Sequence, residues 1–387
     1  MKKINVKGLT LSELEGFIVS IGEKKFRAGQ LFDALYGKEA SSFDEMTTLS
    51  KVFREQLKEI AVIESSRLIE TQISGRDSTV KYLFELADGK RIESVLIPPR
   101  SAFANADPKA EPDEKEEQQR LTLCVSTQVG CALDCKFCAT ASMGFLRNLT
   151  AGEIIDQVMQ AKRLSGKKIT NLVYMGMGEP LMNYDNVMKS VEIISTAMNI
   201  AAKRITISTA GWVPKIRQMA DEKRRVKLAV SLHTLDEHAR TELMPVNQKY
   251  SLRELLTSLE YYYSKVKQRI TFEYILFDGW NDRDEDAARL IKLSKTIPSK
   301  FNIIPYHSIA FTKPAGIAAR LHPASPRRSE EFLEKLRNAN LTVFMRSSAG
   351  DDIDAACGQL AVKVERGRSI SRKPHSQQSK STTFRSA

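Results

Sequence analysis

The stretch Cys131-Ala-Leu-Asp-Cys135-Lys-Phe-Cys138 places three thiols in one short loop, with the spacing CxxxCxxC. Three thiolates so arranged can reach a single metal centre. A [4Fe–4S] cluster usually has four thiolate ligands, so a set of three leaves one iron open to a substrate. The amino and carboxylate groups of S-adenosylmethionine (SAM) require such an open iron, and an electron from the cluster can then cleave the sulfonium. The stretch therefore predicts a [4Fe–4S] cluster that generates a 5′-deoxyadenosyl radical from SAM.

A structural zinc site is the alternative for the same thiols. Zinc prefers four tetrahedral ligands and usually draws them from two spaced pairs. Here the fourth ligand would have to be Cys124, Cys357 or a distant histidine. Phe137, directly before the last cysteine, is a further feature of the radical SAM pattern. The spacing favours the cluster, and a non-enzymatic zinc protein that binds RNA stands as the rival from another class.

Composition indicates the kind of partner. The 387 residues include 59 Lys and Arg against 47 Asp and Glu, a formal net charge of +12. A basic balance of this size suits a polyanion, most commonly nucleic acid. The five cysteines are an odd count, which argues against a disulfide framework. We find neither a signal peptide nor an apolar run long enough to span a membrane, and expect a cytoplasmic protein.

Short β-rich runs alternate with helical patterns from Leu121 onward, which predicts βα units around a parallel sheet. Strand candidates there are 121–127, 170–175, 204–209, 226–232, 269–277, 301–306 and 341–346. The expected domains are an N-terminal helical RNA-binding accessory domain (1–62), a β-hairpin extension (63–98), a polar linker or loop (99–120), a barrel with a C-terminal cysteine loop (121–363) and a disordered basic tail (364–387). Reactive groups should gather at the carboxyl ends of the parallel strands.

Two motifs, CVSTQVGCALDCKFCATASMGF (Cys124 to Phe145) and GDDIDAACGQL (Gly350 to Leu360), resemble the signatures of the RlmN/Cfr family of radical SAM RNA adenine methyltransferases. The resemblance extends from the N-terminal helices to about Val362. It implies an α/β fold, an incomplete (β/α) TIM-like barrel of the radical SAM type. The RlmN branch of the family methylates carbon 2 of adenine 2503 in 23S rRNA and of adenine 37 in tRNA. The Cfr branch methylates carbon 8 of the same rRNA adenine and shares the same catalytic motifs.

The resemblance assigns roles to the two remaining cysteines. Cys357 matches the thiol that a first SAM methylates. A second SAM supplies the radical that turns this S-methyl group into an S-methylene radical, which adds to the adenine. Cys124 matches the cysteine that resolves the covalent protein–RNA adduct by forming a transient disulfide with Cys357. Glu93 matches a proposed proton acceptor. Without the resemblance, Cys357 would be taken for a small buried hydrophobe and Glu93 for a solvent-facing strand residue.

Further positions match contacts to the cofactor in the family. They are Gly178, Glu179, Ser208, Ser231, Leu232, His233 and His307. Two positions depart from the family pattern. His307 stands where an asparagine is expected, and Ala349 stands where a basic residue is expected, with Arg346 the nearest candidate to replace that contact.

The resemblance also implies partners: 23S rRNA, tRNA and an electron donor such as flavodoxin, for a monomeric enzyme. Basic clusters that could contact phosphates lie at Lys24, Lys25 and Arg27, at Arg147, Lys162, Arg163, Lys167 and Lys168, and at Arg224 and Arg225. The cysteine count argues against a methylthiotransferase, because a second cluster would need three further cysteines and only two remain.

Overall fold

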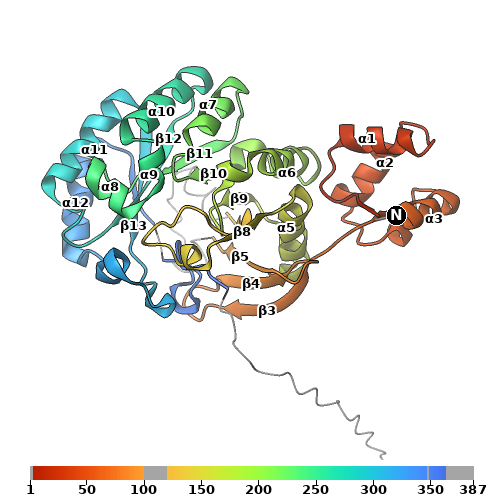
Figure 1. Cartoon of the computed structure of the whole chain (residues 1–387), viewed down its shortest axis with the longest axis horizontal. Helices are drawn as coiled ribbons and strands as arrows, with labels where there is room; N and C mark the ends of the chain where they lie inside the picture. The colour runs from red at the N-terminus through yellow and green to blue at the C-terminus, as the bar shows by residue number, and fades with distance from the viewer. Residues whose placement is uncertain (1–2, 100–119, 347, 363–387) are drawn as a thin grey trace, which may run out of the picture.

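The computed structural model describes residues 3–99, 120–346 and 348–362. It has a small helical unit on one side and a larger α/β body on the other, joined through the first strands of the body (Figure 1). The expected loop at 99–120 and the expected tail at 364–387 lie almost wholly outside the described residues. No helix among the described residues is long and apolar enough to cross a membrane.

The helical unit precedes the sheet. Its elements are β1 (Ile4–Asn5), α1 (Leu11–Ser20), α2 (Arg27–Phe32), η1 (Asp33–Gly37), η2 (Phe43–Glu45), α3 (Lys51–Ile60) and β2 (Ala61–Val62). A capping box begins α1, because Thr10 accepts a hydrogen bond from the Glu13 N–H and Glu13 accepts one from the Thr10 N–H. The apolar side of α1 is buried at Leu14, Phe17 and Ile18. The region expected to be helical thus contains α1, α2 and α3.

The body is built on one sheet in the order β14-β13-β12-β11-β10-β9-β6-β5-β4-β3. Its strands are β3 (Arg67–Ile73), β4 (Val80–Glu85), β5 (Arg91–Ile97), β6 (Thr122–Cys124), β9 (Asn171–Tyr174), β10 (Ile205–Thr209), β11 (Lys227–Ser231), β12 (Ile270–Leu276), β13 (Ser299–Pro305) and β14 (Val343–Met345). From β6 to β14 all pairings are parallel, whereas β3, β4, β5 and β6 are antiparallel neighbours. The first three strands therefore extend the barrel sheet itself as a meander.

Helices connect the parallel strands and cover the outside of the sheet (Figure 1). They are α5 (Ala151–Ser165), α6 (Tyr184–Ala197), α7 (Val213–Asp221), α8 (Glu237–Leu243), α9 (Val246–Lys249), α10 (Leu252–Val266), α11 (Asp284–Thr296) and α12 (Pro326–Asn338). Short turns of helix are η4 (Ala139–Met143), η5 (Pro180–Asn183), η6 (Ala202–Arg204), η7 (Ala310–Thr312), η8 (Gly316–Arg320) and η9 (Asp351–Ile353). A separate hairpin, β7 (Gln128–Gly130) with β8 (Phe145–Asn148), flanks the cysteine motif.

The sheet does not close, because β3 and β14 are its two edges and do not pair. The predicted incomplete α/β barrel is confirmed. The loop after β14, which carries Cys357, lies against the turn between β3 and β4. Asp77 Oδ2 accepts from the Gly350 N–H at 2.9 Å, and Asp352 Oδ2 accepts from the Gly75 N–H at 3.0 Å. The cysteine loop thus spans the open edge of the barrel.

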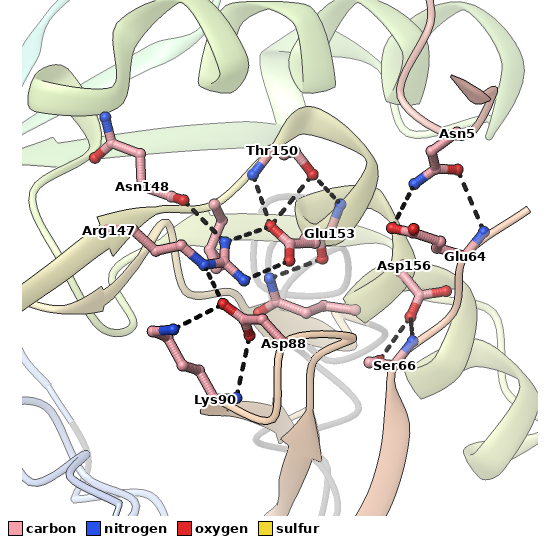
Figure 2. Close-up of polar contacts among 12 residues, drawn as sticks. Asn5, Glu64, Ser66, Asp88, Lys90, Arg147, Asn148, Thr150, Glu153 and Asp156 are labelled. Carbon is pink, nitrogen blue, oxygen red and sulfur yellow. Dashed lines mark hydrogen bonds and ion pairs between the residues drawn. The ribbon is translucent and has the colours of Figure 1, made fainter. Parts of the chain in front are cut away.

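A buried ion pair fixes the helical unit to the body. Lys7 Nζ lies 2.6 Å from Asp156 Oδ1 on α5, and both side chains are nearly inaccessible. The other oxygen of Asp156 accepts from the N–H and the hydroxyl of Ser66, at 2.7 and 2.6 Å (Figure 2). The backbones meet closely beside this pair, since a Cβ on Gly8 would come within 2.3 Å of the Gly152 nitrogen.

We expect Asp156→Ala to lower the free energy of unfolding by about 3–5 kcal/mol, because it leaves the Lys7 ammonium buried and unpaired. Urea unfolding followed by circular dichroism measures the change. The Lys7→Met/Asp156→Leu double variant replaces both charges by apolar groups and should lose much less. Glu331→Ala breaks the exposed pair with Arg327 and should change stability by less than about 1 kcal/mol. Equal losses in the single and double variants would contradict this account.

Candidate functional site

A cavity opens at the carboxyl ends of the parallel strands, where the sequence predicted the reactive groups. It encloses about 820 Å³ of empty space, part of which is open to solvent. The thiols that line it belong to Cys131, Cys135, Cys138 and Cys357. Strand ends contribute Gly178, Glu179, Ser208, Ser231, His233 and Glu273. Most of the predicted site residues therefore lie around one space, although they come from different strands and loops.

The three motif cysteines come from the loop between β7 and η4. The loop is fixed by main-chain bonds at both ends, from Cys131 N–H to Gly144 O at 2.9 Å and from Ala139 N–H to Gly358 O at 2.6 Å. The second bond joins the cluster loop directly to the residue after Cys357. Burial raises the pKa of Cys131 to about 12 and holds the pKa of Cys135 well above its usual value. Buried thiols become thiolates when a cation shares the space.

The donor set suits an iron–sulfur cluster. Three thiols face one cavity that is much larger than a single ion needs. Among the residues that the structure describes, no three His, Cys, Asp or Glu side chains gather as a site for one metal ion. Iron accepts thiolate ligands in sets spread around a cluster several ångströms across. Cys131, Cys135 and Cys138 therefore fit a [4Fe–4S] group, with the remaining cavity available for SAM.

The glycines after β9 serve packing inside the protein. A Cβ on Gly176 would lie 2.7 Å from the Val125 backbone, and one on Gly178 would lie 2.5 Å from Gln128 Cβ. Gly178 also has a φ of +97°, which favours glycine. Gln128 Oε1 in turn accepts from the Glu179 N–H at 2.9 Å. This close fit against the hairpin strand β7 directs the Glu179 side chain toward the cavity.

Glu179 is a buried carboxylate held by backbone donors. Its Oε1 accepts from the Leu181 N–H at 3.0 Å, and its Oε2 accepts from the Ala210 N–H at 2.8 Å. Burial raises the pKa of Glu179 to about 7 against the lowering effect of these bonds. A carboxylate in this state gains from a ligand that brings N–H donors or positive charge.

His233 has a fixed tautomer. Its Nδ1 accepts a hydrogen bond from the Ile275 N–H at 3.1 Å, so in the neutral ring Nε2 carries the proton. Burial, with a smaller effect of Arg240, lowers the pKa of His233 to about 3. The ring packs edge-on against Phe137, with centroids 4.5 Å apart. His233 is thus a neutral N–H donor beside the cluster loop.

Two predicted cofactor contacts lie outside the cavity lining. Leu232 is fully buried, and its main chain bonds to Glu273 O and Arg240. His307 is buried next to the cysteine loop, with Nδ1 3.0 Å from Asp351 Oδ1. Burial lowers the pKa of His307, while Asp351 opposes that shift. Where an asparagine was expected, the structure therefore has a histidine that contacts the loop carrying Cys357.

Cys124 and Glu93 lie on one face of the sheet. Cys124 on β6 pairs with Val95 on β5, and Glu93 is two residues before Val95, so all three side chains point to the same side. The opposite side carries Ser94, whose hydroxyl bonds to Gln157 on the covering helix α5. Cys124 and Glu93 therefore face the inside of the barrel. Burial raises the pKa of the Cys124 thiol to about 12, and a charge on Cys357 raises it further.

Two charged residues lie near the thiol pair: Arg346, which the sequence suggested only as a replacement for the basic residue expected at position 349, and Glu273, which it did not single out. Arg346 lines the cavity, and Nη1 lies 3.3 Å from Glu273 Oε2 on β12. The charge of Cys357 has the largest effect on the pKa of Arg346 and raises it. Glu273 and Cys124 raise this pKa as well, whereas burial lowers it. A charged residue inside the apolar run Ile270–Leu276 is the signal that would have found Glu273.

Arg147 was expected to contact phosphates, but in the structure it pairs with two carboxylates of the protein. Its guanidinium binds both oxygens of Glu153, at 2.8 and 2.9 Å, and Nε donates to Asp88 at 2.7 Å (Figure 2). Lys162 and Arg224 are likewise paired, with Glu39 and Glu222. Arg147 fixes the hairpin β7–β8 to the turn between β4 and β5, beside the cysteine motif.

Comparisons with known proteins agree with this arrangement. Residues 4–63 match the family model of the ribosomal RNA large subunit methyltransferase N-terminal domain, and residues 125–291 match that of the radical SAM superfamily. The chain is 43% identical over 366 residues to a probable dual-specificity RNA methyltransferase RlmN of Thermoanaerobacter sp. strain X514, covering 94% of this chain and 99% of the relative. It is also 43% identical over 370 residues to the dual-specificity RNA methyltransferase RlmN of Syntrophobacter fumaroxidans, with coverage of 94% and 99%.

A solved structure is similar over the same length. The crystal structure of a radical SAM methyltransferase from Sphaerobacter thermophilus superposes with a TM-score of 0.80 at 38% identity, covering 92% of this chain and 99% of that one. The barrel, the helical unit and the cavity described above therefore belong to one architecture.

We expect His233 to stay neutral, with its proton on Nε2, from about pH 8 down to about pH 5. Because its folded pKa is lowered, its burial costs stability as pH falls below the ordinary histidine value, where the unfolded chain binds a proton first. Nitrogen-15 NMR of the histidine rings in the cluster-free protein measures both properties, with His233→Gln to assign the signal. A protonation midpoint near pH 6 would contradict the assignment.

Proposed function

The chain belongs to the RlmN family of radical SAM RNA methyltransferases, and on that premise we propose that it methylates carbon 2 of adenine in 23S rRNA and in tRNA. The family carries a [4Fe–4S] cluster and uses SAM. One observation supports the proposal most: Cys357 lines the same cavity as the three motif cysteines. A thiol beside a radical source can carry the transferred carbon itself.

The cluster and SAM supply a methyl group in one step and a 5′-deoxyadenosyl radical in another. In our proposal Cys131, Cys135 and Cys138 hold the cluster. Glu179 accepts hydrogen bonds from the amino group of SAM. SAM receives further contacts from the main chain at Gly178 and Leu232 and from the hydroxyls of Ser208 and Ser231. The Nε2–H of His233 donates to SAM as well. His307 contributes from its position beside the cysteine loop.

The thiol pair carries out the transfer. The Cys357 sulfur loses its proton and attacks the methyl carbon of a first SAM, which would leave as S-adenosylhomocysteine. A second SAM would supply the radical that takes a hydrogen atom from the S-methyl group. The methylene carbon then bonds to the adenine ring, Glu93 accepts the ring proton, and the adduct gives up one electron, which the cluster would take back. The Cys124 thiol loses its proton and its sulfur bonds to the Cys357 sulfur as the carbon–sulfur bond breaks. The released carbon takes up a proton, which leaves the methyl group on RNA and a disulfide on the protein. This route is needed because carbon 2 of adenine is not nucleophilic.

RNA is the substrate class of the family, and the finer partners are part of the proposal. We propose 23S rRNA and tRNA as substrates, in the cytoplasm where both reside, and a monomeric enzyme reduced by a flavodoxin-like electron donor. In our proposal Lys24, Lys25 and Arg27 of the helical unit contact RNA phosphates.

Nucleoside analysis by mass spectrometry tests the regiochemistry. Anaerobically reconstituted protein, supplied with SAM, a reductant and 23S rRNA or tRNA, should yield 2-methyladenosine. An 8-methyladenosine product would assign the chain to the Cfr-type activity instead. Protein that binds zinc without sulfide and transfers no methyl group would defeat the radical mechanism altogether.

Three cysteine variants should separate three functions. Cys131→Ala should lose the cluster, measured as iron and sulfide content, because two thiolates cannot replace three. Cys357→Ala should keep the cluster and lose methyl transfer. Cys124→Ala should keep the cluster and the S-methyl group on Cys357, and should accumulate the covalent protein–RNA adduct on a denaturing gel. Methyl transfer by Cys357→Ala would contradict the covalent route.

A further inference from the structure

We propose that Lys81 is a positioning residue that keeps Glu93 in its carboxylate form and ties it to the loop that carries Cys357. The inference rests on the proposed function, because it concerns the step in which Glu93 accepts the ring proton. Lys81 lies on β4, in the antiparallel part of the sheet, and does not line the SAM cavity.

Lys81 contacts both parts of this machinery. Its Nζ lies 3.6 Å from Glu93 Oε1, and it donates to the carbonyl oxygen of Asp354 at 3.3 Å. The Lys81 and Glu93 side chains are only 8% and 7% exposed. Solvent therefore screens this pair little, unlike the ion pairs of the protein surface.

The register of the sheet places these groups on one face. Lys81 pairs with Val95 across β4 and β5, and Val95 pairs with Cys124 across β5 and β6. Directly paired residues share a face, and Glu93 shares it with Val95 because side chains alternate along a strand. Lys81, Glu93 and Cys124 thus form one cluster on the inner face of the barrel.

The contact to Asp354 reaches the cysteine loop near its reactive residue. Asp354 ends η9, three residues before Cys357, and its φ of +51° turns the chain there. The same loop is bonded to Asp77 and Gly75 in the turn just before β4. The Lys81 ammonium group therefore contacts both Glu93, the proposed proton acceptor on β5, and the loop that carries Cys357.

A charged partner is needed because Glu93 is buried. Burial in an apolar surrounding favours the neutral form of a carboxylic acid, which cannot accept a proton. A cation within ion-pair distance favours the charged form. Lys81 supplies that cation and touches neither SAM nor RNA in our proposal, so it acts through Glu93.

Because Lys81 acts through Glu93, its loss should affect only the part of the reaction in which Glu93 accepts a proton. Methylation of Cys357 and formation of 5′-deoxyadenosine do not require Glu93 to accept a proton. Completion of the methylated adenine does require Glu93 to accept the ring proton. Loss of Lys81 should therefore leave the first two reactions close to normal and slow the last.

The test compares Lys81→Met, Lys81→Gln, Lys81→Arg and Glu93→Gln in the reconstituted enzyme with RNA. Three products are followed: S-methyl-Cys357 by peptide mass spectrometry, 5′-deoxyadenosine, and methylated adenine. We expect Lys81→Met to keep the first two within about twofold and to slow adenine methylation by roughly 10- to 100-fold, the size expected when acid–base catalysis is impaired. Lys81→Gln retains a donor for the Asp354 carbonyl without the charge and should be similarly slow. Lys81→Arg restores the charge and should recover most of the rate.

A double-variant cycle decides whether Lys81 acts through Glu93. Lys81→Met added to Glu93→Gln should cause no further loss, because the group it serves is already gone. Multiplying losses would overturn the proposal, as would a Lys81→Met enzyme that folds but leaves Cys357 unmethylated. Lys90→Met, at the exposed turn after β4, is the matched control and should behave as wild type.

The result also distinguishes this inference from the proposed function. A wild-type enzyme that yields no 2-methyladenosine defeats the proposed function. A wild-type enzyme that yields it, together with Lys81→Met and Lys81→Gln enzymes at the wild-type rate, defeats only the role of Lys81. Thermal melting identifies a variant that has lost its fold, and the Gln and Arg variants then carry the comparison.

Discussion

Hydrogen bonds accepted by two aspartates hold the loop that carries Cys357 across the open edge of the barrel, and the proposed thiol chemistry depends on them. Asp77 in the turn after β3 accepts from the Gly350 N–H, and Asp352 in the loop accepts from the Gly75 N–H. The backbone at Gly350 has a φ of +72°, and a Cβ there would lie 2.9 Å from the Thr79 methyl group. The loop therefore fits against the meander only with glycine at this position. Together with the bond from the Ala139 N–H to the Gly358 carbonyl, this contact holds Cys357 at the cavity.

The positions of the five cysteines match the two kinds of chemistry that we propose for them. Three lie on a loop fixed to the hairpin β7–β8 and to Gly358, and one of the others, Cys357, faces the same cavity. Cys124 approaches from the inner face of β6. Arg346, held by Glu273, lies near both thiols of the proposed transfer pair, and its charge lowers the pKa of Cys124 against the effect of burial. A permanent cation at this place favours the thiolate, which is the form that attacks both a methyl donor and a neighbouring sulfur.

The elements that could be predicted from the sequence are those that a local residue pattern defines by itself. Strand alternation predicted β6 and the strands from β9 to β14 within a few residues but missed the short hairpin strands β7 and β8. The CxxxCxxC spacing predicted the loop at the cavity. Sequence could not show that the meander joins the barrel sheet, because pairing between β5 and β6 crosses a long connection. It gave Gly178 as a cofactor contact, and the structure adds a close approach to Gln128 at the same residue, which lines the cavity. It also treated Arg147 as a free basic residue, since the carboxylates that bind it, Asp88 and Glu153, are near it only in the fold. Lys81 and Glu273 look like ordinary strand residues until the register puts them beside Glu93 and Arg346.

The antiparallel strands β4 and β5 extend the inner face of the barrel beyond the strands of the βα units. Adjacent strands lie about 4.8 Å apart, so β4, β5 and β6 can bring Lys81, Glu93 and Cys124 together without a connecting helix between them. Such a face depends on register, because a slip of one residue would turn all the side chains of a strand to the other side. The turn at Asp88 sets that register, and Arg147 holds it: their hydrogen bond keeps the pKa of Asp88 well below its usual range and joins the turn to the hairpin that flanks the cluster loop (Figure 2). The same arginine binds Glu153, which begins α5, the helix that Lys7 of the helical unit contacts. Two sets of ion pairs on α5, one with Arg147 and one with Lys7, thus connect the helical unit, the hairpin that flanks the cluster loop and the turn of the meander.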